Sequence, residues 1–149
     1  RSTFKSDKLS LTHVRKFITL LPVNYVLEKV NIATAEDIDQ NLHAFSRTWE
    51  TVEKFVKNGL GYCIRYKDKV VSHAGSIFPF KKNLEIQVDT DPDYRRNGFA
   101  TIVCAKLIQH CLLNDIIPYW EAHTEISARI AEKLGFNDPW KYDLFMKIN

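Results

Sequence analysis

Residues 84–100 read LEIQVDTDPDYRRNGFA and decide the fold. Their alternating first part, residues 84–90, predicts a strand, and a turn follows at residues 91–94. The next six residues, Arg95-Arg96-Asn97-Gly98-Phe99-Ala100, open a helix that we expect to run to about Asn114. Free backbone N–H groups and the positive end of a helix dipole converge at such a start and suit a phosphate. Gly98 lets the backbone approach a ligand closely, and small Ala100 leaves room beside it.

Composition indicates one ordinary globular domain. The 149 residues are 45% apolar and 26% charged, and the net charge of +3 is a weak argument for an anionic small-molecule partner. The sequence has no dense Lys/Arg stripe of the kind that would indicate nucleic-acid binding. It also has no run of about 18 apolar residues that would predict a membrane span. Cys63, Cys104 and Cys111 form neither a disulfide framework nor a metal-binding Cys-x-x-Cys pair, so we expect a reducing cytoplasm and no metal.

The patterns on either side predict alternating strands and helices. The expected strands are residues 25–31, 61–66, 69–80, 84–90, 118–122 and 140–148. The expected helices are one capped by Thr34 with Ile38, Leu42, Phe45 and Trp49 on one face, a short one ending at Asn58-Gly59, one after Gly98, and one from Thr124 to Gly135. Residues 1–23 are interpreted as an N-terminal segment, containing a short helical pattern, that links residues 24–149 to an upstream region. The start at Arg1 and the single Met146 favour such a longer protein.

This order of elements, with Arg-x-x-Gly-x-Ala at Arg95, Gly98 and Ala100, resembles the GNAT superfamily of acyl-CoA-dependent N-acetyltransferases. A second signature, AEKLGF at residues 131–136, resembles the end of a late helix in that family. The resemblance covers residues 24–149 and implies an α/β fold with a mixed, splayed β-sheet flanked by helices. Finer matches, such as Leu20-Leu21-Pro22 and Val88-Asp89-Thr90, are similar to a bacterial branch that includes antibiotic self-resistance enzymes.

The resemblance implies acetyl-CoA as co-substrate. The residues that it assigns to the CoA pyrophosphate and the nearby helix start are Arg95, Arg96, Asn97, Gly98, Phe99, Ala100 and Thr101. Val88, Asp89 and Thr90 would carry the pantetheine and thioester, on a strand that a bulge splays from its neighbour, and the N–H near Val88 would meet the oxyanion. Thr124 stands where many members have Asn against the CoA arm.

Glu85 and Asp89 are the candidate general bases. With Gln87 they share one face of the strand, and an amine must lose a proton before it attacks. Glu85 is the first candidate and Asp89 the second, and a structural pairing is the alternative for each. Ala131 stands where many members have an acidic Tyr, so Tyr119, Tyr142 or water could protonate the leaving thiolate, and we assign no acid.

The expected reaction is direct transfer of acetyl from acetyl-CoA to a primary amine of a small molecule or a peptide. A non-catalytic acyl-CoA-binding or regulatory module is the alternative, and nucleic-acid binding is disfavoured. Trp49, Phe55, Phe78 and Phe80 are candidates for the acceptor pocket, with core packing as the default for the first two. Cys63 is interpreted as a core residue rather than an acyl carrier, and His123 could face the cleft.

Overall fold

In the described part of the chain, seven strands form one mixed sheet in the order β2-β3-β4-β5-β6-β1-β7. The computed structural model describes residues 1–45 and 48–141. The strands are β1 (Ser2–Lys5), β2 (Tyr25–Lys29), β3 (Gly61–Tyr66), β4 (Lys69–Ser76), β5 (Asn83–Thr90), β6 (Ile117–Ala122) and β7 (Asn137–Lys141). The helices are α1 (Leu11–Ile18), α2 (Ile32–Leu42), α3 (Val52–Asn58), α4 (Phe99–Leu113) and α5 (Glu125–Leu134), with a 3₁₀ turn at Pro92–Tyr94. This is the mixed α/β fold expected from the sequence.

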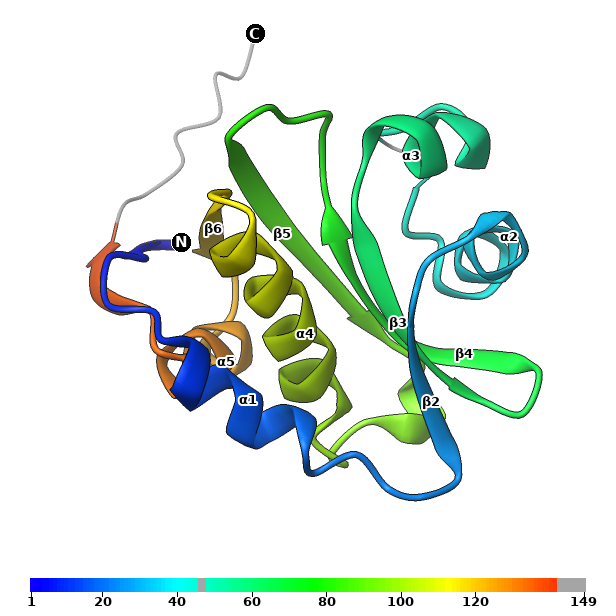
Figure 1. The fold of residues 1–149 in the computed structure, drawn as a ribbon, viewed down its shortest axis with the longest axis horizontal. Coiled ribbons are helices and arrows are strands. Elements are labelled where there is room, and N and C mark those ends of the chain that lie inside the picture. The colour runs from blue at the N-terminus through cyan, green and yellow to red at the C-terminus, as the bar shows by residue number, and fades with distance from the viewer. Residues whose placement is uncertain (46–47, 142–149) are drawn as a thin grey trace, which may run out of the picture.

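The helices cover the two faces of the sheet unequally. Helices α1, α4 and α5 gather on one side, and α2 and α3 lie on the other (Figure 1). Helix α4 is apolar nearly all round and buries nine of its fifteen residues. A helix of this composition belongs in the interior, and α4 packs against the sheet in the larger core cluster. The smaller cluster, under α2 and α3, contains Phe45, Trp49 and Phe55.

Strands β5 and β6 are parallel over a short stretch and then part. Only three residue pairs join them, from Asn83↔Ile117 to Glu85↔Tyr119. Beyond these pairs β5 continues beside β4 alone, while β6 pairs with β1 over residues 120–122. The splay expected from the sequence is therefore confirmed, and it leaves one edge of β5 open from Ile86 onward.

The expected bulge in β5 is wrong. Its pairing with β4 runs without a shift from Ser72↔Thr90 to Ser76↔Ile86. The irregularity instead lies between β3 and β4, where Ile64 pairs with Ser72 and Arg65 with Val70. Val71 is the extra residue on β4, as in a β-bulge. The divergence of β5 and β6 thus occurs without a register shift between β4 and β5.

Residues 1–23, interpreted from the sequence as a linking segment, contribute a strand and a helix to the sheet and core. Strand β1 lies between β6 and β7 and is antiparallel to both. Phe4 from β1 and Val14 from α1 are buried in the larger core cluster. The four-residue strand was missed because only one of its side chains is buried, so no alternation marks it. A longer protein with an upstream region stays a prediction.

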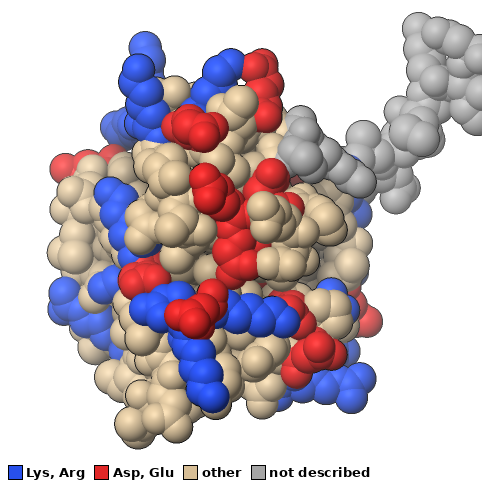
Figure 2. Space-filling view, turned by 90° about the vertical axis from the view of Figure 1, so that its right-hand side faces the viewer, with Lys and Arg blue, Asp and Glu red and all other residues tan. Residues whose placement is uncertain are grey.

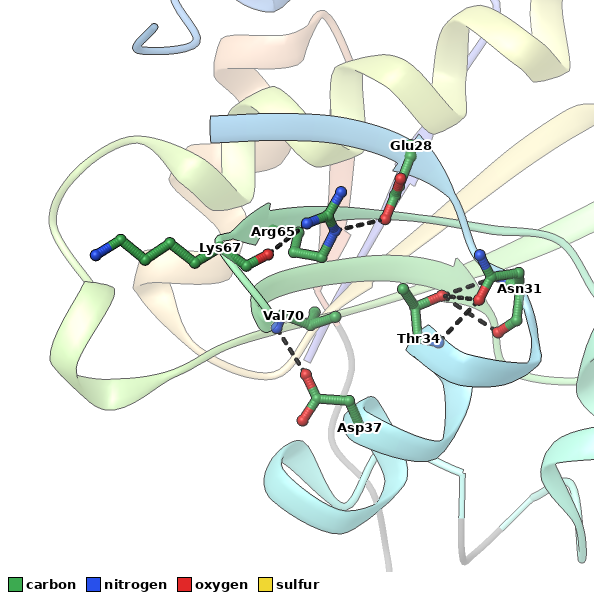
Figure 3. A network of polar contacts seen from close by, with 7 residues as sticks. All are labelled: Glu28, Asn31, Thr34, Asp37, Arg65, Lys67 and Val70. Atoms are coloured by element: carbon green, nitrogen blue, oxygen red, sulfur yellow. Dashed lines mark hydrogen bonds and ion pairs between the residues drawn. The ribbon is translucent and has the colours of Figure 1, made fainter. Parts of the chain in front are cut away.

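Several element ends differ from the sequence expectation. The N-cap of α2 is Asn31 and not Thr34, and the two side chains form a reciprocal capping box (Figure 3). The helix ends at Leu42, so Phe45 and Trp49 are buried but not helical. Strand β4 ends at Ser76, before residue 80. The last strand is residues 137–141, and residues 142–148 of the expected strand lie outside the described part of the chain.

Candidate active site

The predicted phosphate-binding turn ends at an open helix start. Within the described residues, the backbone N–H groups of Gly98, Phe99, Ala100 and Thr101 have no acceptor, and the first bond of α4 runs from Ile102 to Gly98. Gly98 is the N-cap with φ of 77°, and no side chain caps the helix. Apart from its neighbours in the chain, no atom of the described residues would lie within 4 Å of a Cβ at Gly98. The site is therefore open to an anion from solvent, with several donors aimed at it.

The side chains of the turn divide between solvent and protein. Arg95 and Arg96 are exposed, and the Arg95 Nε donates to the Thr90 carbonyl at 3.4 Å. The Asn97 amide donates to the carbonyls of Tyr94 and Arg95, which closes the turn. In contrast, the buried Phe99 ring packs on Tyr25, with ring centroids 4.7 Å apart. Phe99 can thus offer a ligand only its backbone, and the buried Thr101 side chain lies in the first turn of α4.

Asp91 holds the turn in place. Its carboxylate pairs with Lys69 at 2.9 Å and accepts from the Asp93 N–H at 2.9 Å. Its own N–H donates to the Val71 carbonyl on β4. The bond to Lys69 is the main reason why the pKa of Asp91 lies below its ordinary value. The start of α4 is therefore anchored to the end of the sheet.

The open edge of β5 leads to this turn. The Glu85 carbonyl accepts from Ile77 and the Asp91 N–H bonds Val71, so odd-numbered residues of β5 direct their backbone toward β4. Because backbone groups alternate along a strand, Val88 and Ile86 direct theirs to the opposite side, where β6 has turned away. The Thr90 hydroxyl, for its part, lies 2.9 Å from the Ser72 hydroxyl. The free edge can pair with an extended ligand, as a further strand would.

Glu85 lines a cavity where β5 and β6 part. The cavity has a volume of about 370 Å³, and its walls include Thr3, Phe78, Asn83, Glu85, Tyr119 and Glu121. Burial chiefly, and then the charge of Glu121, raise the pKa of Glu85 above its ordinary value. His123 and Arg1 act in the opposite direction. A carboxylate with a raised pKa in a cavity is suited to take a proton from an amine.

Asp89, the second candidate base, is placed differently. It lies on the same face of β5 but does not line the cavity that holds Glu85. Its carboxylate accepts from the Gln87 amide at 3.1 Å, and that amide also donates to the Ala44 carbonyl. Burial is the first cause that raises the pKa of Asp89. The geometry favours a packing role for Asp89 and leaves Glu85 as the better-placed base.

Thr124 and Ala131, where the sequence departs from the family pattern, lie at the start and near the end of α5. Thr124 is the N-cap of α5, and its hydroxyl accepts from the Ser127 N–H at 3.1 Å. It also lines a second cavity of about 490 Å³, together with His123. Ala131, where a Tyr was expected, is fully buried in the core. No hydroxyl at that position can protonate a thiolate.

The alternative chemical groups are core residues. The Cys63 thiol is buried, and burial raises its pKa to about 12, which disfavours an acyl-carrying thiolate. Trp49 and Phe55 pack in the smaller core, whereas Phe78 is half exposed and lines the cavity with Glu85. No three His, Cys, Asp or Glu side chains in residues 1–45 and 48–141 are grouped to hold a metal ion.

Thr3 and Glu121 are the site residues that sequence reasoning missed. Thr3 was missed with β1. Glu121 is two residues from Tyr119 along β6, so the sequence could have placed both side chains on one face, but the nearness of Glu121 to Glu85 depends on the pairing of β5 with β6. Figure 2 shows the side of the molecule where α2 and α3 lie, with Asp and Glu gathered in its middle and Lys and Arg around them.

Comparison with solved structures places the molecule among GNAT-like α/β proteins. A GCN5-related N-acetyltransferase-like protein from Streptococcus suis is 32% identical, with a TM-score of 0.83 over 94% of this chain and 59% of that one. The aminoglycoside N-acetyltransferase AAC(6')-Iy, solved with CoA, has a TM-score of 0.61 at 12% identity and covers 83% of this chain and 94% of its own. At that identity the likeness shows the fold alone.

The chain belongs to the GNAT acetyltransferase family, whose sequence profile matches residues 1–145. An uncharacterized N-acetyltransferase of Bacillus subtilis, YdfB, is 30% identical over 84% of this chain and 49% of its own length. The chain thus spans 59% of the Streptococcus suis protein and 49% of YdfB. In the described part of the chain, no helix is both long and apolar enough to cross a membrane.

Proposed function

We propose that this chain transfers acetyl from acetyl-CoA directly to a primary amine of a small molecule. One observation carries the proposal: the open edge of β5 runs from the cavity at Glu85 to the unpaired N–H groups at the start of α4. An elongated ligand with a phosphate at one end and a carbonyl at the other fits that path. A location in the cytoplasm stays a prediction.

The N–H groups of residues 98–101 would bind the pyrophosphate, with Arg95 and Arg96 adding charge. The backbone of Val88 and Thr90 would pair with the pantetheine amides, and Thr124 would border the same arm. The Val88 N–H would stabilise the oxyanion that forms at the thioester carbonyl. These donors are already held by the sheet and by Asp91, so little reorganisation is needed.

Glu85 would start the reaction by taking a proton, directly or through water, from the bound ammonium. The amine nitrogen then attacks the thioester carbon, the oxyanion collapses, and the C–S bond breaks. CoA leaves as a thiolate that takes a proton from water, and the new amide loses its second proton. The net products are the N-acetyl amide, CoA and one proton. Holding the two substrates together would supply most of the rate, roughly 7–11 kcal/mol in favourable cases.

A non-catalytic acyl-CoA-binding module is the second candidate. The buried Ala131 favours it, because the family's usual proton donor is absent there. It predicts cofactor binding without transfer to any amine. The two candidates share the binding site and differ only in turnover.

Calorimetry with acetyl-CoA and CoA, followed by an assay of thiol release with a panel of amines, tests both candidates. Gly98→Glu should abolish binding, because it places a negative charge against the phosphates, whereas Gln40→Glu adds the same charge at an exposed position on α2 outside the site. Failure of the folded wild-type protein to bind acetyl-CoA would refute both candidates. Binding of acetyl-CoA without thiol release would refute the transferase and support the non-catalytic acyl-CoA-binding module.

The nature of the acceptor is supported by the cavity rather than by the fold. An aminoglycoside acetyltransferase from a soil metagenome has been solved with sisomicin, and it shares the fold at 12% identity and a TM-score of 0.63. Such a likeness does not transfer a substrate. The 370 Å³ cavity is of a size for a small molecule, and a peptide amine is the alternative.

A further inference from the structure

The cavity at the parting of β5 and β6 holds two carboxylates and no basic side chain in its lining. Glu85 comes from β5 and Glu121 from β6. Glu85 is level with Tyr119, and Glu121 lies two residues further along, on the same face as Tyr119. The two acidic groups therefore enter one space from the two strands that diverge around it.

The rest of the lining suits an organic cation. Phe78 and Tyr119 are 53% and 43% exposed although both are large and aromatic. Aromatic faces attract ammonium groups, and their apolar surface can cover a carbon chain. Asn83 and Thr3 add neutral polar groups to the same walls.

The charges in the cavity are only partly compensated by the protein. Glu121 lies 3.8 Å from the Arg1 guanidinium, and both side chains are partly exposed. An ion pair of that kind is weak, so a ligand ammonium can share the carboxylate. No hydrogen bond to the Glu85 carboxylate is found in the described part of the chain, which leaves that group available to a ligand.

We propose that this cavity selects acceptors with two positive charges, and that Glu121 binds the second ammonium while Glu85 receives the ammonium to be acetylated. The role given to Glu85 rests on the proposed function. The binding of a dication in the cavity does not depend on that function. A monoamine would leave Glu121 with only its weak pairing to Arg1, whereas an alkyl diamine neutralises both carboxylates and covers the aromatic faces. Glu121 is thus a specificity-determining residue.

Binding is tested first, in the absence of acetyl-CoA. Calorimetry would compare 1,5-diaminopentane with pentylamine on the wild type, Glu121→Gln, Glu121→Asp and Glu36→Gln. The last variant removes the same charge from an exposed position on α2 that lines neither cavity. We expect the diamine to bind more tightly than the monoamine to the wild type. Glu121→Gln should weaken the diamine roughly 10- to 100-fold, while Glu121→Asp and Glu36→Gln should stay within about threefold.

Turnover then separates this inference from the proposed function. If acetyl-CoA binds and both amines are acetylated with equal kcat/KM, unchanged by Glu121→Gln, the selectivity for dications is wrong and the transferase stands. If the diamine binds as predicted but no acetyl-CoA binds, the transferase is wrong and the cation site stands. Acetyl-CoA affinity and thermal melting of Glu121→Gln, both expected to match the wild type, show that the variant is folded.

Discussion

At the scale of single residues, position 98 requires glycine because of its backbone conformation and not because neighbouring atoms crowd it. Its φ of 77° suits glycine, and among the described residues beyond its chain neighbours no atom would touch a Cβ there. Gly98→Ala should therefore destabilise the protein by about 1–2 kcal/mol. Gly98→Asn should cost less, because Asn tolerates the left-handed region. Urea denaturation of the three proteins measures this, and an equal cost for both variants would contradict the backbone explanation.

Glu85 gives a second prediction at this scale, for its protonation. Burial and the charge of Glu121 both raise the pKa of Glu85. Removing a like charge favours the ionised form, so Glu121→Gln should lower the pKa of Glu85 toward, but not to, the 4.5 of an ordinary glutamate, because burial remains. Carboxyl ¹³C NMR titration of both proteins is the measurement. No change would mean that the two carboxylates do not interact, and a rise would contradict repulsion between them.

These two residues also show how far the sequence could predict the site. Gly98 could be identified because its role is local, in a turn before a helix. Glu85 could be placed on a face by alternation. Glu85 could be distinguished from Asp89 only once the cavity was known. The place of Glu121 in the site could be found only from the pairing of two strands that lie about 30 residues apart in the sequence.

At the scale of elements, α5 begins on the side chain that was also predicted to contact the CoA arm. Thr124 caps the helix through the Ser127 N–H. Thr124→Ala should cost about 1 kcal/mol of stability, and Thr124→Asn, which keeps a capping oxygen, should cost little. Denaturation and acetyl-CoA calorimetry on both variants separate the two roles. Loss of affinity in both variants, with stability kept in Thr124→Asn, would assign the hydroxyl to the cofactor.

The elements themselves were predictable where a local pattern marks them. Strand β5 alternates, α4 follows a turn with glycine, and α5 ends at Gly135 in the left-handed region. The sequence predictions were wrong where tertiary contacts determine whether an element forms or where it ends. Strand β1 exists because it fills the space between β6 and β7. Helix α2 ends at Leu42 although apolar residues continue at helical spacing.

At the scale of the whole molecule, a buried histidine links folding to pH. His73 is 1% exposed, and neither ring nitrogen has a hydrogen-bond partner among the described residues. Burial lowers its pKa to about 3 from 6.5. Below pH 6.5 the unfolded chain binds a proton there that the folded protein refuses, so stability is lost as the pH falls from 6.5 toward 3. His73 should contribute a slope of up to about 1.4 kcal/mol per pH unit.

The matched variants are His73→Leu and His43→Asn. The first removes the buried imidazole, so its free energy of unfolding should depend less on pH between 6 and 4. The second replaces an exposed histidine in the left-handed region with a residue that tolerates it. Urea denaturation at several pH values compares them with the wild type. A slope in His73→Leu as steep as that of the wild type would show that other groups dominate the acid response.

The place of β1 in the sheet also bears on how the protein is made. Thr3 pairs with Glu121, so β1 finds this neighbour only after roughly 120 further residues have been synthesised. Until β6 and β7 follow, the edges of β1 have no strand beside them, and an unpaired edge attracts other chains. Stalled or truncated translation products that end between α5 and β7 should therefore depend on chaperones more than the finished protein does.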